Sequence, residues 1–564
     1  MRCMEGAMST GYRNRNLFFI RLICAALSCL FWLTGANARF GPPGNSSITI
    51  EGNLFADPDR CSRCHDGLYD EDGIDASFVR NWETSMMHFS FMDPFWQAKV
   101  KSETIRNPNA ANFIEEKCAR CHAPMASEQA NYDGADVFLF GGGGLLDTDS
   151  RYHALAMQGV GCTLCHQLEA SSFDSGGFSV NYDQVARGPF FPDFSRTMFR
   201  ATGFNPEFNF HPMDPQFCAT CHDLFTDYFD KEGVKKSTPE TLFPEQTPYL
   251  EWLSSSFSEE NKSCQSCHMH HIDEIKISRM PRKIPVRQDV LTHTFLTENT
   301  MMLEIISSIT KSQGLGIPDL NNVIADGEDY IAEAGGIEIL EPVVWIDYDK
   351  DNQYDDLSVT LRVTNDAGHK LPTSIPVRRV FIHFAVYDFN GECLFSSGDT
   401  DDEGRIVGVD FDEFPLLIEP HYDLITKEDQ VQVYEGIMEN WEHEVTYTLL
   451  RAARFRKDNR LLPRGFYMAT APQKILPVGV VDDNFVGGED KVTYIVRNIS
   501  AKNEIKIEVE LKDQTLSYRM VNDLVRDITE DDSGLIDLFY TEYQHHRVHY
   551  ELIDSDEKRL AVEP

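Results

Sequence analysis

Basic residues are scarce relative to acidic ones in this sequence of 564 residues. Lys and Arg number 51 against 90 Asp and Glu, which gives a formal net charge of −39. A surface of that sign repels polyanions, so neither nucleic acid nor an anionic membrane is an expected partner. The same charge favours redox partners with basic surfaces, although it also simply keeps a secreted protein in solution.

Long hydrophobic runs are equally scarce. One apolar stretch, 22–33, follows Arg13, Arg15 and Arg21 and precedes the small residues of 36–38. It is shorter than the roughly 20 residues that a spanning helix needs, and the pattern is typical of a secretory signal peptide. We therefore predict a signal peptide over 1–38, a linker over 39–53, no stable membrane span in the mature chain, and a periplasmic or extracellular location. An uncleaved membrane anchor is the alternative.

Few cysteines remain for disulfide bonds. Ten of the fourteen belong to five copies of Cys-x-x-Cys-His, and three others lie in the N-terminal leader. A secreted protein stapled by disulfides would carry more cysteines outside such motifs. The copies occupy residues 61–65, 118–122, 162–166, 218–222 and 264–268.

The spacing of this motif suits covalent attachment of haem. Two cysteines three residues apart can form thioethers to the two vinyl groups of one haem, and the following His coordinates its iron. A single copy could also be half of a zinc site, but zinc motifs pair with another Cys-x-x-Cys or with two histidines, whereas here all five copies end identically. The sequence therefore predicts five haem c groups. The predicted attachment residues are Cys61, Cys64, Cys118, Cys121, Cys162, Cys165, Cys218, Cys221, Cys264 and Cys267, and the predicted proximal ligands are His65, His122, His166, His222 and His268.

The sixth ligand of each iron decides the chemistry. A second His is typical of low-potential carriers and leaves no open position for a substrate. The distal ligands that we predict are His88, His153, His211, His293 and His369. His270 and His271 follow the fifth motif too closely to serve its own haem easily, but could reach a neighbouring one. Met is the other credible ligand type, and Met86, Met87, Met125, Met157 and Met269 lie near motifs.

The composition divides the chain and predicts an α+β multidomain protein. Residues 54–288 are expected to form a haem-packed pentahaem domain of short helices and loops, and 289–336 a helical connector. From 337 to 543 the chain is rich in β-branched and aromatic runs, which predicts an antiparallel β-sandwich-like domain. The expected strands are 343–348, 357–364, 380–387, 492–496 and 505–511. Residues 544–564 are expected to be an exposed tail.

Phrases around the motifs resemble the cytochrome c-552/c-554-type multihaem family. They are 81–88 followed by 93–96, 117–125, 159–166, 217–222, 264–269, 293–295 and 368–373, so the resemblance covers roughly residues 55–380. It implies electron transfer in bacterial or archaeal respiration, with His293 and His369 as distal ligands. Relatives often have glycine where this chain has 296–298 and Ser374, which affects loop shape but not the histidines. The family also contains members with catalytic haems.

Three functions follow from these patterns. The preferred one is electron transfer between a donor and an acceptor protein without catalysis. The second is a haem enzyme in which one open iron acts on a small nitrogen or sulfur compound. The third is a filament-forming or complex-docking subunit, as a homo-oligomer or within a respiratory complex. Pentahaem nitrite reductase is disfavoured, because its catalytic haem uses a Cys-x-x-Cys-Lys motif and this chain has none.

Two weaker signals remain open. Asp347, Asp349 and Asp351 resemble the start of a calcium loop, but Asn352 and Ser358 stand where that loop requires Gly and Glu, so a solvated acidic hairpin is the alternative. Arg378 and Arg379 would suit haem propionates if His369 ligates a haem, whereas the alternative is a solvated strand end.

Overall fold

The computed structural model describes residues 54–169, 175–414, 416–499, 504–546 and 550–561. The chain combines short helices with several mostly antiparallel sheets, in agreement with the α+β prediction. The predicted signal peptide and linker, 1–53, lie outside the described residues. Within the described part, no helix has both the length and the apolar character needed to cross a bilayer.

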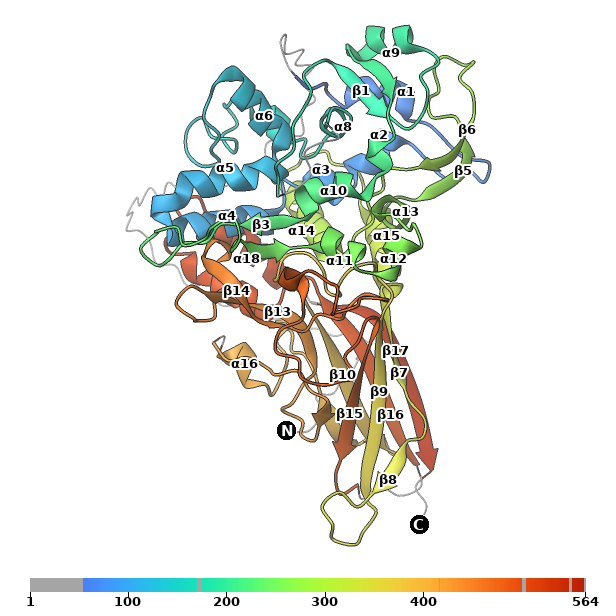
Figure 1. The fold of residues 1–564 in the computed structure, drawn as a ribbon, viewed down its shortest axis with the longest axis vertical. Helices are drawn as coiled ribbons and strands as arrows, with labels where there is room; N and C mark the ends of the chain where they lie inside the picture. The colour runs from blue at the N-terminus through green and yellow to red at the C-terminus, as the bar shows by residue number, and fades with distance from the viewer. Residues whose placement is uncertain (1–53, 170–174, 415, 500–503, 547–549, 562–564) are drawn as a thin grey trace, which may run out of the picture.

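Short helices dominate the region that carries the five motifs, at the top of Figure 1. They are α1 (Asp59–His65), α2 (Phe78–Glu83), α3 (Met86–Phe89), α4 (Pro94–Arg106), α5 (Ala111–His122), α6 (Pro124–Asp133), α7 (His153–Ala156), α8 (Cys162–Cys165), α9 (Ser195–Thr202), α10 (Pro215–His222), α11 (Pro248–Leu253), α12 (Ser256–Glu259) and α13 (Cys264–His268). Three strand pairs accompany them: β1 (Val185–Gly188) with β2 (Asn205–Phe208), β3 (Leu224–Thr226) with β4 (Phe243–Gln246), and β5 (His271–Ile275) with β6 (Arg287–Leu291). The helices α14 (Thr300–Ser312) and α15 (Asn321–Ala332) then follow, within the segment predicted as helical.

Two sheets form the lower part of the molecule in Figure 1. One has the order β14-β13-β10-β16-β17 with β11 beside β10, and the other the order β12-β15-β9-β7 with β8 beside β9. The bounds are β7 (Gly335–Ile339), β8 (Val344–Ile346), β9 (Asp356–Asn365), β10 (Arg379–Asp388), β11 (Cys393–Ser397), β12 (Leu424–Ile425), β13 (Val433–Asn440), β14 (Ala452–Asp458), β15 (Glu489–Val496), β16 (Glu504–Gln514) and β17 (Glu551–Ala561), with a short helix α16 (Asp410–Glu413). All five expected strands are present.

The two sheets share one core, because buried side chains alternate with less buried ones along their strands. Buried and half-buried residues follow each other along β9 and β16, so every second side chain points inward. Leu361 of β9, Phe384 of β10 and Val509 of β16 are fully buried in this common cluster. Strands β10 and β16 pair antiparallel without a register shift from Arg379 with Gln514 to Asp388 with Ile505.

Two expectations about the C-terminal end are wrong. The predicted β region also contains α17 (Tyr518–Leu524) and α18 (Leu535–His545), and α18 packs against α4 of the motif region, with the rings of Phe539 and Phe95 5.5 Å apart. The predicted exposed tail contains β17, which pairs antiparallel with β16. Half-buried and exposed residues alternate along β17, because only one face of this edge strand is covered.

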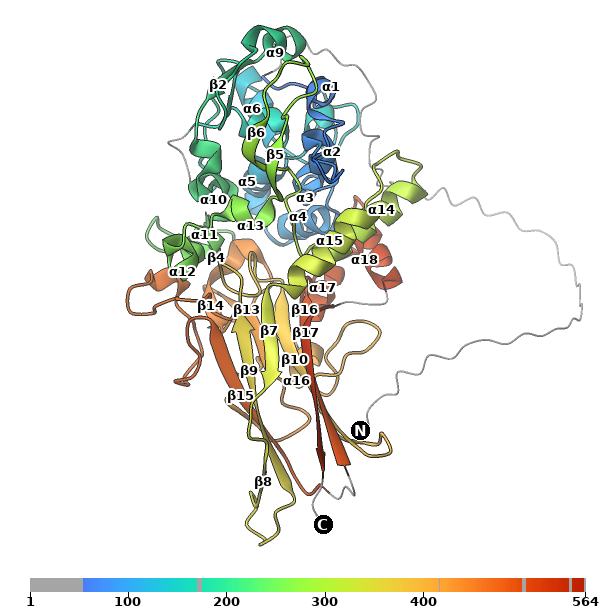
Figure 2. The same ribbon diagram turned by 90° about the vertical axis from the view of Figure 1, so that its right-hand side faces the viewer.

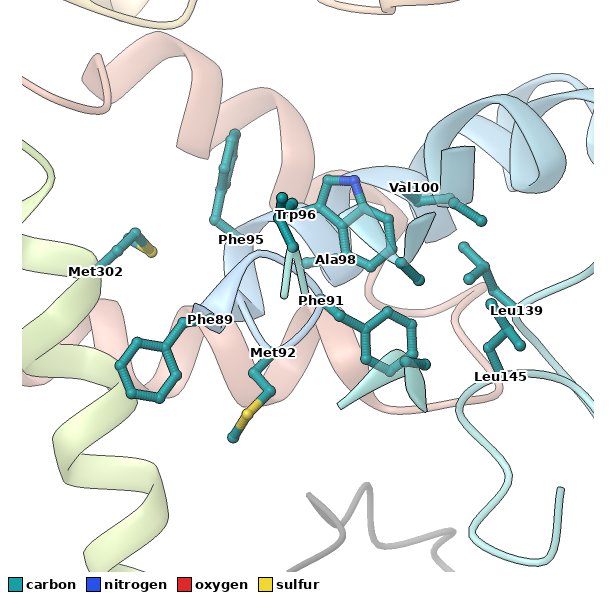
Figure 3. Packing of buried hydrophobic residues seen from close by; sticks show 14 of the residues in the cluster. Phe89, Phe91, Met92, Phe95, Trp96, Ala98, Val100, Leu139, Leu145 and Met302 are labelled. Atoms are coloured by element: carbon teal, nitrogen blue, oxygen red, sulfur yellow. The ribbon is translucent and has the colours of Figure 1, made fainter. Parts of the chain in front are cut away.

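The joint between the motif region and the C-terminal helices is a large apolar cluster. Figure 3 shows Phe95 and Trp96 of α4 near Phe89 and Met92, with Met302 of α14 facing them. Helix α4 begins at Pro94, where the carboxylate of Asp93 accepts the N–H groups of Phe95 and Trp96. This cap provides acceptors for two backbone N–H groups at the start of α4, and it fixes the residue at which α4 enters the apolar cluster.

Aspartates of β17 cap the free edge of β7. The carboxylates of Asp554 and Asp556 each accept a backbone N–H, from Ile337 and Ile339, at 2.9 Å. Because β7 is the last strand of its sheet, these contacts join the two sheets along one side and block edge pairing with another chain.

Replacing both aspartates tests this edge. We expect Asp554→Ala with Asp556→Ala to lower the free energy of unfolding by about 2 kcal/mol or more, because hydrogen bonds to a charged acceptor contribute about 1.5–3 kcal/mol each. Urea unfolding followed by circular dichroism measures the change. The exposed Glu557→Ala on the same strand is the control, and an equal loss in both variants would contradict the role of the caps.

Candidate haem-binding site

One continuous cavity of about 1150 Å³ runs through the motif region. It exceeds the roughly 300–1,000 Å³ of a pocket for one small molecule. Both cysteines and the His of every one of the five motifs contribute to its wall, as do His293 and His369. Segments from 60 to 516 therefore meet around a single space.

Helical structure explains why each motif presents its side chains together. All five motifs lie in or at the end of a helix, namely α1, α5, α8, α10 and α13. Residues three apart share a helix face, so the two thiols of one motif point the same way.

Four of the five motif histidines are held through Nδ1. This atom lies 2.7 Å from the carbonyl oxygen of Ile277 in His65, 2.9 Å from that of Ser90 in His122, 2.6 Å from that of Arg187 in His166 and 2.9 Å from that of Leu296 in His268. A neutral ring that donates its Nδ1–H to a carbonyl has no proton on Nε2. This tautomer can bind a metal through Nε2. Among the described residues no comparable bond holds His222.

Burial keeps these rings uncharged. It lowers the pKa of His122 and of His268 to about 4, and that of His293 to about 3. The neutral form is the one that can donate a lone pair to iron.

Two histidine pairs have the separation that a shared metal requires. The ring centroids of His166 and His293 lie 6.3 Å apart with planes at 25°, and those of His268 and His369 lie 6.3 Å apart with planes at 21°. Metal–imidazole bonds of about 2.0–2.1 Å, with the ring radii added, put the centroids of two axial imidazoles about 6.3 Å apart. The residues therefore fit a haem iron at the third and at the fifth motif.

The other predicted distal ligands lie outside the cavity wall. His88 and His153 are buried, and each keeps one ring nitrogen without a protein partner: Nδ1 of His88 and Nε2 of His153. His211 is half-buried beside Phe217 of α10, with ring centroids 5.5 Å apart. Their assignment to particular motifs stays a prediction. His270 and His271 are exposed, at the start of β5.

Cysteines of different motifs contact each other across the cavity. The thiols of Cys61 and Cys162 lie within hydrogen-bonding reach, as do those of Cys121 and Cys221, and those of Cys218 and Cys264. The first motif thus adjoins the third, and the fourth adjoins both the second and the fifth.

A buried cluster of alternating charges holds His369 in place. The carboxylate of Asp458 pairs with Lys370 at 2.6 Å and with Arg460 at 2.8 Å, and all three side chains are almost fully buried. Glu251 of α11 accepts the backbone N–H of Lys370 at 3.1 Å and lies 3.5 Å from Arg460. Since Lys370 follows His369 directly, the cluster connects the β region to the motif region at the fifth motif.

The two arginines behave differently. Arg378 lines the cavity, where it forms an ion pair with Glu298, so its pairing with a propionate stays a prediction. Arg379 is fully buried and binds Asp412 through two hydrogen bonds of 2.7 and 2.8 Å. Both the propionate role and the solvated strand end are therefore wrong for Arg379.

The suspected calcium loop is an acidic turn. Asp347 accepts the backbone N–H groups of Asp351 and Asn352 at 2.9 and 3.0 Å, and Asp349 and Asp351 are exposed. The carboxylate oxygens of Asp347, Asp349 and Asp351 lie within 4.8 Å of one another, so both the calcium loop and the solvated hairpin stay predictions.

Sequence reasoning missed a second polar cluster, inside the β region. Nε2 of His421 lies 2.8 Å from Asp482 and 3.7 Å from Asp490. Gln432 donates its amide N–H to Nδ1 of His421, because its oxygen already accepts the N–H of Tyr422. Nε2 must then carry the proton, and it lies 2.8 Å from the carboxylate of Asp482.

No family model matches the chain, and no curated protein matches its sequence. Among solved structures, the chain is similar to a penta-heme cytochrome c552 from Thermochromatium tepidum, with 14% identity and a TM-score of 0.44 over 89% of this chain and 98% of that chain. A similarity at this level defines neither a fold nor a function.

Breaking the charge cluster beside His369 should strongly destabilise the protein. We expect Asp458→Asn to lower the free energy of unfolding by about 3–5 kcal/mol, because Lys370 would stay buried without its ion-pair partner and Arg460 would keep only Glu251, at 3.5 Å. Denaturant unfolding of the holoprotein measures it. The control is Glu260→Gln, which removes an exposed pair with Arg464 at the same interface and should cost less than about 1 kcal/mol. Similar losses would mean that burial of the cluster is unimportant.

Asp490 makes a pH-dependent contribution to stability. Burial raises its pKa from 3.8 to about 7, so between about pH 4 and 7 the native state holds a proton that the unfolded state has lost. This group therefore lowers stability as pH rises, by about 1.4 kcal/mol per pH unit. We expect Asp490→Asn to remove that slope in urea unfolding at several pH values, whereas the exposed Asp483→Asn should keep it.

Proposed function

We propose that the chain is a secreted multihaem c-type cytochrome that passes electrons between redox partner proteins through five covalently bound haems. The observation that carries this proposal is the single cavity whose wall includes all five Cys-x-x-Cys-His motifs. Haem iron supplies reversible one-electron chemistry without a bond-making step on a substrate.

The contacts between motifs support a connected set of haems. Thioether sulfurs mark the edge of each macrocycle, and the cysteines of motifs one and three, two and four, and four and five touch. Cys165 of the third motif also interacts electrostatically with Cys218 and Cys221 of the fourth. The proposed haem order therefore runs from the first motif to the third and then to the fourth. From the fourth motif it branches to the second and to the fifth.

The protein itself supplies orientation and exclusion of water. Backbone carbonyls fix the ring planes of His65, His122, His166 and His268, and Trp96 stacks on His122 with centroids 4.6 Å apart. Pairing of His166 with His293 and of His268 with His369 would close both axial positions of two irons, which favours a carrier over an enzyme there. His88, His153 and His211 are the remaining histidines for the other three.

We further propose the division made from the sequence: cleavage of 1–38, a linker over 39–53, a pentahaem domain over 54–288, a helical connector over 289–336 and a β-sandwich-like domain from 337. The location would be periplasmic or extracellular. The helices α17 and α18 and the strand β17 extend the sandwich-like domain to 561.

Spectroscopy of the purified holoprotein tests the proposal. We expect five haems per chain by the pyridine haemochrome assay and only low-spin ferric signals by EPR. Axial planes near 21° and 25° should give rhombic low-spin signals for two of the haems, because near-parallel imidazoles produce that type. A high-spin signal in the wild-type protein would instead favour the enzyme with one open iron.

Variants test the two pairs directly. His293→Ala and His369→Ala should each convert one haem to high spin, and added imidazole should restore the low-spin signal by filling the vacated position. His271→Ala, at an exposed histidine close to the fifth motif, is the matched control and should leave the spectrum unchanged. Unchanged spectra in all three variants would refute both assignments.

A further inference from the structure

A basic stretch stands out in this acidic chain. Residues 276–287 contain Lys276, Arg279, Arg282, Lys283 and Arg287 and no acidic residue, although the chain has a net charge of −39. The stretch connects β5 to β6 and lies at the same end of the molecule as α1 and α9 (Figure 2).

This connection touches the first motif through its backbone. The carbonyl of Ile277 binds Nδ1 of His65 at 2.7 Å, and the backbone N–H of Arg279 binds the carbonyl of Cys64 at 2.9 Å. The guanidinium of Arg279 also donates to the carbonyl of Arg63 at 2.7 Å. The basic side chains are therefore fixed directly beside the first haem-binding motif.

Helix α9 extends the same surface. Thr197 and Met198 of α9 line the cavity together with Met280 and Ile284 of the connection and with Cys61. Arg287 joins the two segments, because its guanidinium donates to the carbonyl of Phe191 at 2.8 Å and forms an ion pair with Asp193. We call this surface the basic face. Its exposed charges are Lys276, Arg279, Arg282 and Lys283 of the connection and Arg196 and Arg200 of α9.

Most of these charges are not neutralised internally. Arg279 has Asp66 nearby, but no ion pair between described residues involves Lys276, Arg282, Lys283, Arg196 or Arg200. Among them lie exposed apolar side chains: Met280 and Val286 are each 50% exposed, and Phe199 is 47% exposed. Exposed apolar side chains in the same segments as unpaired arginines are a composition that protein-binding surfaces share.

The first motif is also a free end of the proposed haem order. Its cysteines contact only the third motif, whereas the fifth is covered by the β region through His369 and α11. A partner that exchanges electrons with this end can approach over the basic face, which adjoins the first motif.

We propose that the basic face is the docking site of an acidic redox protein, one that carries carboxylates around its own electron-transfer cofactor. The proposal rests on the proposed function. Charge complementarity selects this partner, since the rest of the acidic surface would repel it and leave the basic face as its only favourable approach.

A strongly acidic flavodoxin serves as the probe, with the complete holoprotein. In the measured step one electron leaves flavodoxin hydroquinone, which becomes the semiquinone, and reduces one ferric haem to the ferrous state. Stopped-flow absorbance gives the second-order rate constant at several ionic strengths, and titration calorimetry gives the Kd independently of electron transfer.

The test variant is Arg282→Glu with Lys283→Glu, two exposed residues whose side chains form no hydrogen bond or ion pair with other described residues. We expect its rate constant at low ionic strength to fall about tenfold or more, its salt dependence to flatten and its Kd to rise. The control is Lys231→Glu with Lys427→Glu, which changes the net charge equally at exposed sites away from the first motif and should change the rate less than about twofold.

Several results would overturn the proposal. Equal effects of the two double variants would mean that only net charge matters, and no effect of the first would exclude docking there. If that variant instead lost binding to phosphatidylglycerol vesicles while binding flavodoxin normally, the basic face would be a membrane contact. A holoprotein without haem by the pyridine haemochrome assay would refute the proposed function itself, whereas five haems with unchanged flavodoxin kinetics would refute only the docking site.

Discussion

The structure depends on one continuous cavity of about 1150 Å³, around which segments from residue 60 to residue 516 meet. Fifteen motif residues converge on it, so under the proposed function the folding of this region and the attachment of haem would be one process.

The β region contributes more than a separate core. His369 reaches the fifth motif from the loop after β9, and the charge cluster behind it includes residues of β14, of that loop and of α11. Helix α18 packs on α4 from the other side. Burying an ion pair costs desolvation free energy, and removing one partner costs still more stability because the other charge stays buried. Such a pair therefore fixes a geometry more than it adds stability. The position of His369, a proposed haem ligand, therefore depends on how the two halves of the chain dock.

The sequence predicted local features well and long-range ones poorly. The alternation of apolar and polar residues along 357–364 and 505–511 lies within one strand each, so these strands could be predicted directly from the sequence. The helix α18 also had a readable pattern, since Leu535, Ile536, Phe539 and Tyr543 lie on one face and are buried. Its place against α4, however, follows from packing between residues more than 400 positions apart. β17 was missed because its sequence is mainly polar, and its pairing comes from the free edge of β16 rather than from its own propensity. Arg379 and the cluster at His421 were missed for a related reason: their partners, Asp412 and Asp482, are distant in the sequence and carry no motif.

The surface charge of this protein differs between the ends of the proposed haem order. A uniformly acidic surface would treat all ends of the order alike. Here one end, at the first motif, lies under a stretch of 12 residues with five basic and no acidic side chains. The fifth motif is closed by the β region, and the second lies beside α4, where Trp96 covers His122. Fields from fixed charges act over about a Debye length, roughly 8–10 Å at physiological ionic strength, so they orient a partner only in the last steps of approach. Basic residues attached through their own backbone to the His65 motif act over that range, so in the proposed docking the contacts that hold His65 would also orient the partner.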